Sequence, residues 1–149
     1  MVGTMTTRWM DRMHSLVPLT EQEEQVDDIL TQYAIEHHQH VVFPVEGRTY
    51  VVDFYLPAYR VVLELWKSTS RRGIALTWVE RNAAYVDLKF RRIKGAYPEV
   101  RCFGLVEVPQ ADPGLVEKYV SVVMEHADGM AYTMERLADT VRGLTRSCS

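Results

Sequence analysis

The segment from Tyr50 to Lys67 constrains this chain most, because it sets two acidic residues inside apolar stretches that are typical of buried β-strands. Its sequence is YVVDFYLPAYRVVLELWK, with Asp53 in the first stretch and Glu64 in the second. A carboxylate costs several kcal/mol to remove from water unless a partner compensates its charge. Two such residues on adjoining strands therefore indicate one shared site, and a divalent cation is its expected occupant.

The composition is that of an ordinary globular protein. The chain has 149 residues, 47% hydrophobic and 25% charged, which predicts a single domain over residues 1–149. Its apolar runs are much shorter than the ~20 residues that cross a bilayer, and the N-terminus lacks the order of a secretory signal. We therefore expect a cytoplasmic protein with no membrane partner. Cys102 and Cys148 give neither a disulfide framework nor a metal-ligand spacing.

Charge is distributed unevenly along the chain, although the net charge is only −3. The stretch from Lys67 to Arg101 holds nine basic and three acidic residues, whereas Glu21 to Glu36 holds six acidic residues and no basic one. Such polarity is compatible with a phosphate-attracting face on an acidic protein. Solvated helix faces of opposite sign explain it equally well.

Periodicity and turn residues predict a helix, three strands, a helix, a strand and then C-terminal helices. Thr20 and Glu23 fit a capping box at the start of the first helix. The helix after the third strand forms a crossover, so strands three and four are expected to be parallel. The fold class is thus an α/β or α+β sandwich around a mixed four-stranded sheet. We expect an arm at 1–18, a core at 19–108 and C-terminal helices at 112–146, with core helices at 21–38 and 77–94 and strands at 41–45, 49–56, 60–66 and 100–108.

The C-terminal helices carry more apolar residues than one face of a small sheet needs. A break at Asp128-Gly129 separates the two expected helices, the second of which runs from Met130 to Leu144. The surplus suggests a homodimer through these helices or a place in a larger DNA-processing assembly. The residues concerned are Val116, Tyr119, Val120, Val123, Met134 and Leu137.

Asp53 and Glu64 carry the chemistry expected of a hydrolytic metal site. Hard ions such as Mg²⁺ or Mn²⁺ bind carboxylate oxygens together with water and substrate phosphate, and activate a water for attack. Lys67 is placed to orient or deprotonate that water, or to stabilise the developing negative charge. Glu23 is the better third acid from the first helix, since it is in line with the inward-facing Val26, whereas Glu24 points further round.

Together these features resemble the PD-(D/E)XK nuclease superfamily, which has a restriction-endonuclease-like αβββαβ core. The resemblance covers roughly residues 20–108 and is carried by an acidic residue in an opening helix, by VVDFYLP and by a strand ending in a carboxylate followed by a lysine. It implies that Asp53 and Glu64 are metal ligands, that the main-chain carbonyl of Leu65 is a third, and that Glu23 is an auxiliary acid.

The chain departs from the family pattern at its lysine. The family places this residue two positions after the glutamate, where this chain has Trp66, and Lys67 comes one residue later. Because strand side chains alternate, Lys67 should point away from Glu64. Three explanations stay open: a bulge or strand end turns Lys67 round, Lys89 or Lys94 replaces it, or the site has lost catalysis and kept the fold.

Other side chains admit a functional and a structural interpretation. Trp66 and Trp78 are able to stack on bases, but packing is favoured for both. The cluster His37, His38 and His40 is interpreted as helix-end histidines rather than a zinc site, since no HExxH or cysteine partner is present. The residues expected to hold a nucleic-acid backbone are Arg71, Arg72, Lys89, Arg91, Arg92 and Lys94.

The leading hypothesis from sequence is therefore a metal-dependent endonuclease that hydrolyses phosphodiester bonds in DNA, or in RNA, with Mg²⁺ or Mn²⁺. Asp53, Glu64, Lys67 and Glu23 are its predicted catalytic residues. The alternative is a catalytically inactive module of the same fold that binds nucleic acid or a protein partner.

Overall fold

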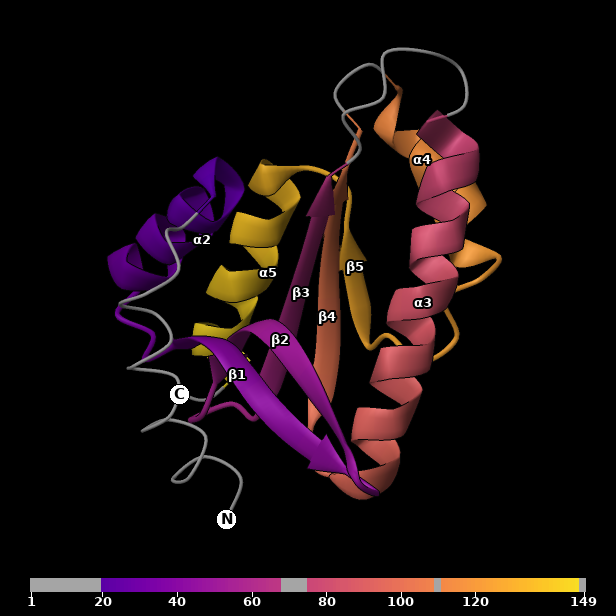
Figure 1. The fold of residues 1–149 in the computed structure, drawn as a ribbon. Helices are drawn as coiled ribbons and strands as arrows, with labels where there is room; N and C mark the ends of the chain where they lie inside the picture. The colour runs from indigo at the N-terminus through magenta and orange to yellow at the C-terminus, as the bar shows by residue number, and fades with distance from the viewer. Residues whose placement is uncertain (1–19, 68–74, 109–110, 148–149) are drawn as a thin grey trace.

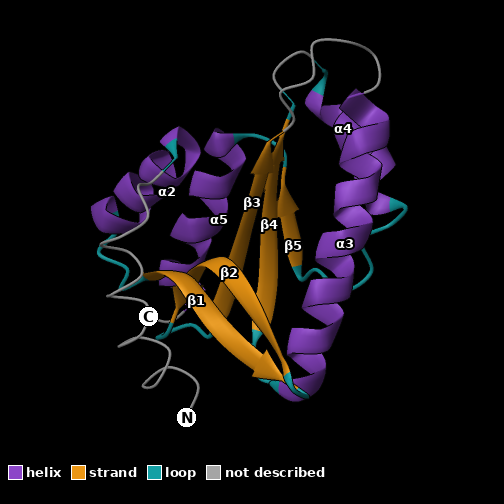
Figure 2. Ribbon diagram, viewed as in Figure 1, coloured by secondary structure: helices purple, strands orange, loops and turns teal. Residues whose placement is uncertain are grey.

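The protein is an α+β sandwich with one mixed sheet between two layers of helices (Figures 1 and 2). The computed structural model describes residues 20–67, 75–108 and 111–147. Helices α2 and α5 cover one face of the sheet, and α3 and α4 cover the other (Figure 1). The elements are α2 (Glu21–Gln32), β1 (His38–Val45), β2 (Arg48–Leu56), β3 (Val61–Lys67), α3 (Ala75–Ala96), β4 (Arg101–Glu107), α4 (Pro113–Ser121), β5 (Gly129–Ala131) and α5 (Met134–Ser147).

The described sheet has five strands in the order β1-β2-β3-β4-β5, so the prediction of four strands is wrong. The first three strands form an antiparallel meander, and β3 and β4 pair in parallel as predicted. The additional strand β5 begins at Gly129, where a helix break was predicted. Three residues are too few to show strand alternation, so the apolar stretch from Met130 was indistinguishable from helix. Glycine is required at this edge, because a Cβ at Gly129 would lie 2.5 Å from the ring of Phe103.

The helix boundaries follow local chemistry. Thr20 and Glu23 form the predicted capping box at the start of α2. This helix ends at Gln32 rather than His38, because Ala34 adopts a positive φ of 56° and pairing with β2 begins at His38. Helix α3 extends two residues beyond the predicted range at each end and includes Gly95.

Strand alternation is interrupted where the predicted site lies. Val52 packs in the core cluster that includes Phe90 of α3, whereas Phe54, only two residues on, packs in the cluster that includes Val26 of α2. Residues two apart on a regular strand share one face. The interruption therefore falls at Asp53, opposite His40, whose φ is 54°.

The C-terminal elements complete the core. Val120 of α4 packs in a cluster with Val79 and Ala83 of α3, and Leu137 of α5 packs in a cluster with Val26 of α2. Most of the apolar surplus is therefore used within the chain. Among residues 20–67, 75–108 and 111–147, no helix combines the length and apolarity needed to cross a membrane.

Candidate metal centre

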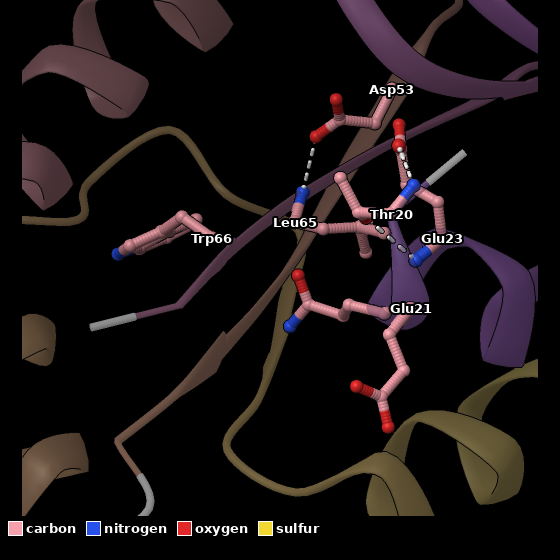
Figure 3. A pocket seen from close by; sticks show the side chains of 7 residues that line it. Thr20, Glu21, Glu23, Asp53, Leu65 and Trp66 are labelled. Carbon is pink, nitrogen blue, oxygen red and sulfur yellow. Dashed lines mark hydrogen bonds between the residues drawn. The ribbon is translucent and has the colours of Figure 1, made fainter. Parts of the chain in front are cut away.

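Asp53 and Glu64 lie where the pairing of β2 with β3 ends, and each carboxylate accepts a main-chain hydrogen bond from the other strand. The ladder runs from Leu56–Val61 to Phe54–Leu63. Beyond it, the N–H of Asp53 donates to Glu64 Oε1 over 2.9 Å. The N–H of Leu65 donates to Asp53 Oδ2 over 2.7 Å (Figure 3). At the point where the strands separate, these two side-chain hydrogen bonds thus take the place of main-chain pairing. Asp53 and Glu64 are therefore neighbours on adjoining strands, as predicted.

The side chains of these acids nevertheless have different neighbours. Asp53 belongs to a group with Glu23 and His40 in which one potential ligand atom of each residue lies within 4.8 Å of the others. Glu64 is not a member of this group and instead faces Lys89 of α3. The structure therefore brings the predicted auxiliary acid Glu23 to Asp53, and brings a lysine to Glu64.

Glu23 is fixed at the start of α2 by its own helix and by His40. Its Oε1 accepts the N–H of Thr20 over 3.0 Å, while its Oε2 lies 2.8 Å from His40 Nε2. Within the described residues, His40 Nδ1 is buried without a hydrogen-bond partner. The other ring nitrogen, Nε2, is the one that contacts a carboxylate, as groups that orient metal ligands commonly do. His40 is thus arranged to donate to Glu23 and orient it.

Sequence reasoning missed His40, which it assigned to a helix end. The strand register of the predicted hairpin nevertheless indicates that His40 lies close to Asp53. The register pairs Gln39–Phe54 and Val41–Val52 place His40 opposite Asp53. Carrying the pairing outward from the turn at Gly47 would have found this histidine.

A depression of about 410 Å³ opens beside Asp53 (Figure 3). It lies between the start of α2 and the strand end, and the predicted ligand Leu65 lines it. The lining is mixed polar and apolar, with acidic side chains on the α2 side. The lining residues are Thr20, Glu21, Gln22, Glu23, Asp53, Leu65 and Trp66.

Lys89 is the lysine that the described contacts bring to Glu64. Its Nζ lies 2.9 Å from Glu64 Oε2 and also donates to the main-chain carbonyl of Val51 over 2.9 Å. Both side chains of this ion pair are largely buried, with exposed fractions of 14% for Lys89 and 8% for Glu64. Lys67 ends β3, in register with Glu107 of β4. Its side chain lies outside the described part of the structure.

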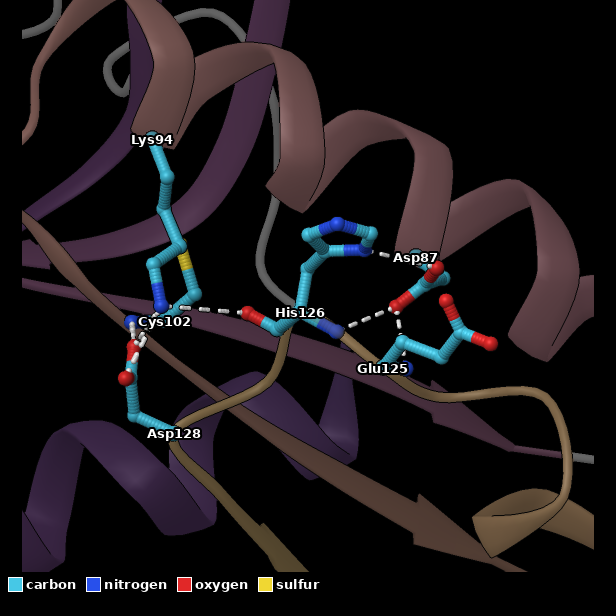
Figure 4. Close-up of polar contacts among 6 residues, drawn as sticks. All are labelled: Asp87, Lys94, Cys102, Glu125, His126 and Asp128. Atoms are coloured by element: carbon cyan, nitrogen blue, oxygen red, sulfur yellow. Dashed lines mark hydrogen bonds and ion pairs between the residues drawn. The ribbon is translucent and has the colours of Figure 1, made fainter.

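Lys94, the other alternative lysine, has a different role. Its Nζ lies 2.8 Å from both carboxylate oxygens of Asp128, which also accepts the N–H of Cys102 (Figure 4). Two helix turns earlier on α3, Asp87 accepts the N–H groups of Glu125 and His126. These contacts fasten the segment before β5 to α3.

Burial governs the protonation of the two acids. Desolvation raises the pKa of Glu64 to about 7, and the charge of Asp53 raises it as well, while Lys89 opposes the shift. Desolvation also raises the pKa of Asp53, although the hydrogen bond from the N–H of Leu65 acts in the opposite direction and lowers it. Displaced titration of neighbouring carboxyls in a partly open site is a feature of functional centres.

The remaining predicted nucleic-acid contacts are placed in part. Arg92 donates to the hydroxyl of Tyr50 over 2.5 Å, which connects α3 to the β1–β2 hairpin. Arg91 is exposed on α3. Arg71 and Arg72 lie outside the described residues.

Comparisons with known proteins leave the family open. No family model matches this chain, and no curated protein is significantly similar to it. The resemblance to the PD-(D/E)XK nucleases therefore stays a prediction that rests on the residues and their arrangement.

Proposed function

We propose that this protein is a metal-dependent phosphodiesterase that cuts DNA, with Mg²⁺ or Mn²⁺ bound at Asp53. One observation carries the proposal: Asp53 and Glu23 line an open depression where β2 and β3 separate, and potential ligand atoms of these two acids and of His40 lie within 4.8 Å of one another. Two carboxylates from different elements meet there, and among the described residues the side chain grouped with them is the imidazole of His40. A divalent cation is the partner that compensates such a pair.

The donor set fits a hard divalent ion. Asp53 and Glu23 supply carboxylate oxygens, and Leu65, which lines the same depression, is the proposed main-chain oxygen ligand. When bound, the ion would activate a water and offset charge on the phosphate. His40 would hold the Glu23 carboxylate in position through its 2.8 Å hydrogen bond, as groups that contact metal ligands commonly do.

Lys89 and Glu64 would supply the second part of the chemistry. The charge of Lys89 lowers the pKa of Asp53, and a lysine near a bound ion would orient the attacking water or stabilise negative charge that develops on the phosphate. Lys89 is largely buried and is held by Glu64 and by the carbonyl of Val51, so its ammonium group is positioned in advance. We therefore assign to Lys89 the role predicted for Lys67.

A plasmid-nicking assay tests the proposal. Wild type should convert supercoiled DNA to the open circle with Mg²⁺ or Mn²⁺ and not with EDTA, and Asp53→Asn should abolish conversion. Asp28→Asn is the matched control, since Asp28 is an exposed acid on α2, and it should cut at the wild-type rate. Cleavage that persists in EDTA or in Asp53→Asn would reject the metal centre.

A second candidate function is a non-catalytic module that binds nucleic acid or a protein. The ion pair of Glu64 with Lys89 favours it, because that carboxylate already has a compensating charge. This function predicts DNA binding without metal, no nicking under any condition and full binding by Asp53→Asn.

A further inference from the structure

A second groove lies where the β1–β2 hairpin meets α3. It has a volume of about 680 Å³, and Lys89 connects it to Glu64. Figure 1 shows the hairpin reaching across to the C-terminal end of α3. No acidic residue is among the lining residues, which are Gly47, Arg48, Thr49, Tyr50, Val51, Tyr85 and Lys89.

The groove presents apolar surface to solvent at one place. Tyr85 is 58% exposed, and it is flanked by Val51 at 39% and Leu88 at 38%. Tyr85 and Leu88 are neighbours one turn apart on α3, and Lys89 Nζ lies 5.9 Å from the centre of the Tyr85 ring. The ring of Tyr85 is therefore exposed to solvent beside the largely buried ammonium group of Lys89.

Cations border this aromatic surface. Arg81, Tyr85, Lys89 and Arg92 recur along α3 at spacings of three and four residues, which places them on one face of the helix. Arg48 completes the border from the hairpin. The guanidinium group of Arg92 is anchored by Tyr50 at the same junction.

An exposed ring flanked by guanidinium groups matches the two parts of a nucleotide. Bases stack on aromatic side chains in a manner that tolerates any sequence, while arginines hold the phosphates. Bases inside a duplex are already stacked on each other, so only an unpaired nucleotide offers a free face. We propose that this groove binds single-stranded DNA, with a base on Tyr85 and the backbone along Arg48 and Arg92. This inference rests on the proposed function only for its choice of DNA as the nucleic acid.

Fluorescence anisotropy with a labelled oligo-dT strand tests the groove. All titrations contain EDTA, so that cleavage is absent and the result does not depend on the metal centre. Tyr85→Ala should weaken binding about tenfold, and Tyr85→Phe should bind as wild type because the ring remains. Tyr119→Ala is the matched control, since Tyr119 is a 40% exposed tyrosine on α4, and it should have no effect. Arg48→Ala should make the slope of log binding constant against log salt concentration less steep, by an amount that corresponds to the loss of about one phosphate contact.

A duplex of the same length serves as the competitor and should displace the strand poorly. The inference is overturned if wild type does not bind oligo-dT, if Tyr85→Ala binds as tightly as wild type, or if duplex competes as well as single strand. Failure here together with metal-dependent nicking would leave the proposed enzyme intact. Tyr85-dependent binding without any nicking would keep the groove and reject the enzyme.

Discussion

Lys89 Nζ of α3 lies 2.9 Å from Glu64 Oε2 of β3, so the lysine that contacts this acid comes from a helix, whereas the sequence pattern placed its lysine on the strand. We expect Lys89→Met to reduce nicking about 100-fold or more, since a positioned proton-transfer or charge-stabilising group contributes at least that much. Lys67→Met should keep most of the activity. Initial nicking rates at saturating Mg²⁺ measure both effects.

Removing Lys89 also leaves Glu64 buried without its partner, which commonly costs 3–5 kcal/mol by the order-of-magnitude rule for such pairs. Thermal unfolding of Lys89→Met must therefore accompany the rates, with Lys94→Met as the control for a lysine bound elsewhere. A folded Lys89→Met that cuts at the wild-type rate would contradict the assignment.

The buried carboxyl of Glu64 predicts a pH-dependent stability. Its pKa rises from the usual 4.5 to about 7 on folding, so the folded state holds a proton that the unfolded state releases. The resulting stabilisation is complete below pH 4.5 and is lost as the pH rises through about 7. Glu64→Gln, which cannot ionise, should become more stable relative to wild type by about 1–3 kcal/mol between pH 4.5 and pH 8.

Urea unfolding of both proteins at several pH values measures that difference. A difference in the free energy of unfolding that stays constant across the range would show that Glu64 ionises normally in the folded protein.

Variants of His40 distinguish two roles for its imidazole: orienting the Glu23 carboxylate and binding the metal directly. His40→Ala should weaken Mn²⁺ binding about tenfold, which is the usual effect of removing a group that holds a ligand. Glutamine places an amide nitrogen near the position of Nε2, so His40→Gln should restore most of the affinity. Isothermal titration with Mn²⁺ measures both variants, and equal losses in Ala and Gln would make the imidazole itself a ligand.

Helix α5 is predicted to stabilise the core rather than to serve only as an interface. Leu137 is 1% exposed and packs in a cluster with α2, so Leu137→Ala should lower the free energy of unfolding by about 2–5 kcal/mol. Leu115→Ala, at a 41% exposed position on α4, should change it by less than about 0.5 kcal/mol. Chemical denaturation measures both, and a small effect at Leu137 would contradict the packing.

Much of the fold follows from local signals in the sequence. The capping box at Thr20 and Glu23, the hairpin and the crossover helix are each determined by residues near one another, and the structure has them all. The end of α2 and the strand β5 were not predictable in this way. Both depend on pairing with distant strands, which outweighs helical periodicity at the histidines and at Met130.

The candidate site was predictable only in part, because some of its contacts also depend on residues that are distant in the sequence. Asp53 and Glu64 stand out because each interrupts an apolar strand, and Glu23 because it lies on an inward helix face. The role of Lys89 depends on how α3 packs across the sheet, which no spacing within β3 encodes. The interruption of alternation at Asp53 likewise separates its surroundings from those of Glu64, whereas their positions on adjoining strands predicted one shared site.

The most direct test of a metal centre at Asp53 is an anomalous difference map from crystals grown with Mn²⁺. The account predicts one peak between the carboxylates of Asp53 and Glu23, at roughly 2.0–2.3 Å from their oxygens, as is usual for small divalent ions. Asp53→Asn crystals should lack this peak. A map without density there, in crystals where Asp53 still accepts the N–H of Leu65 and Glu23 still accepts that of Thr20, would contradict the account.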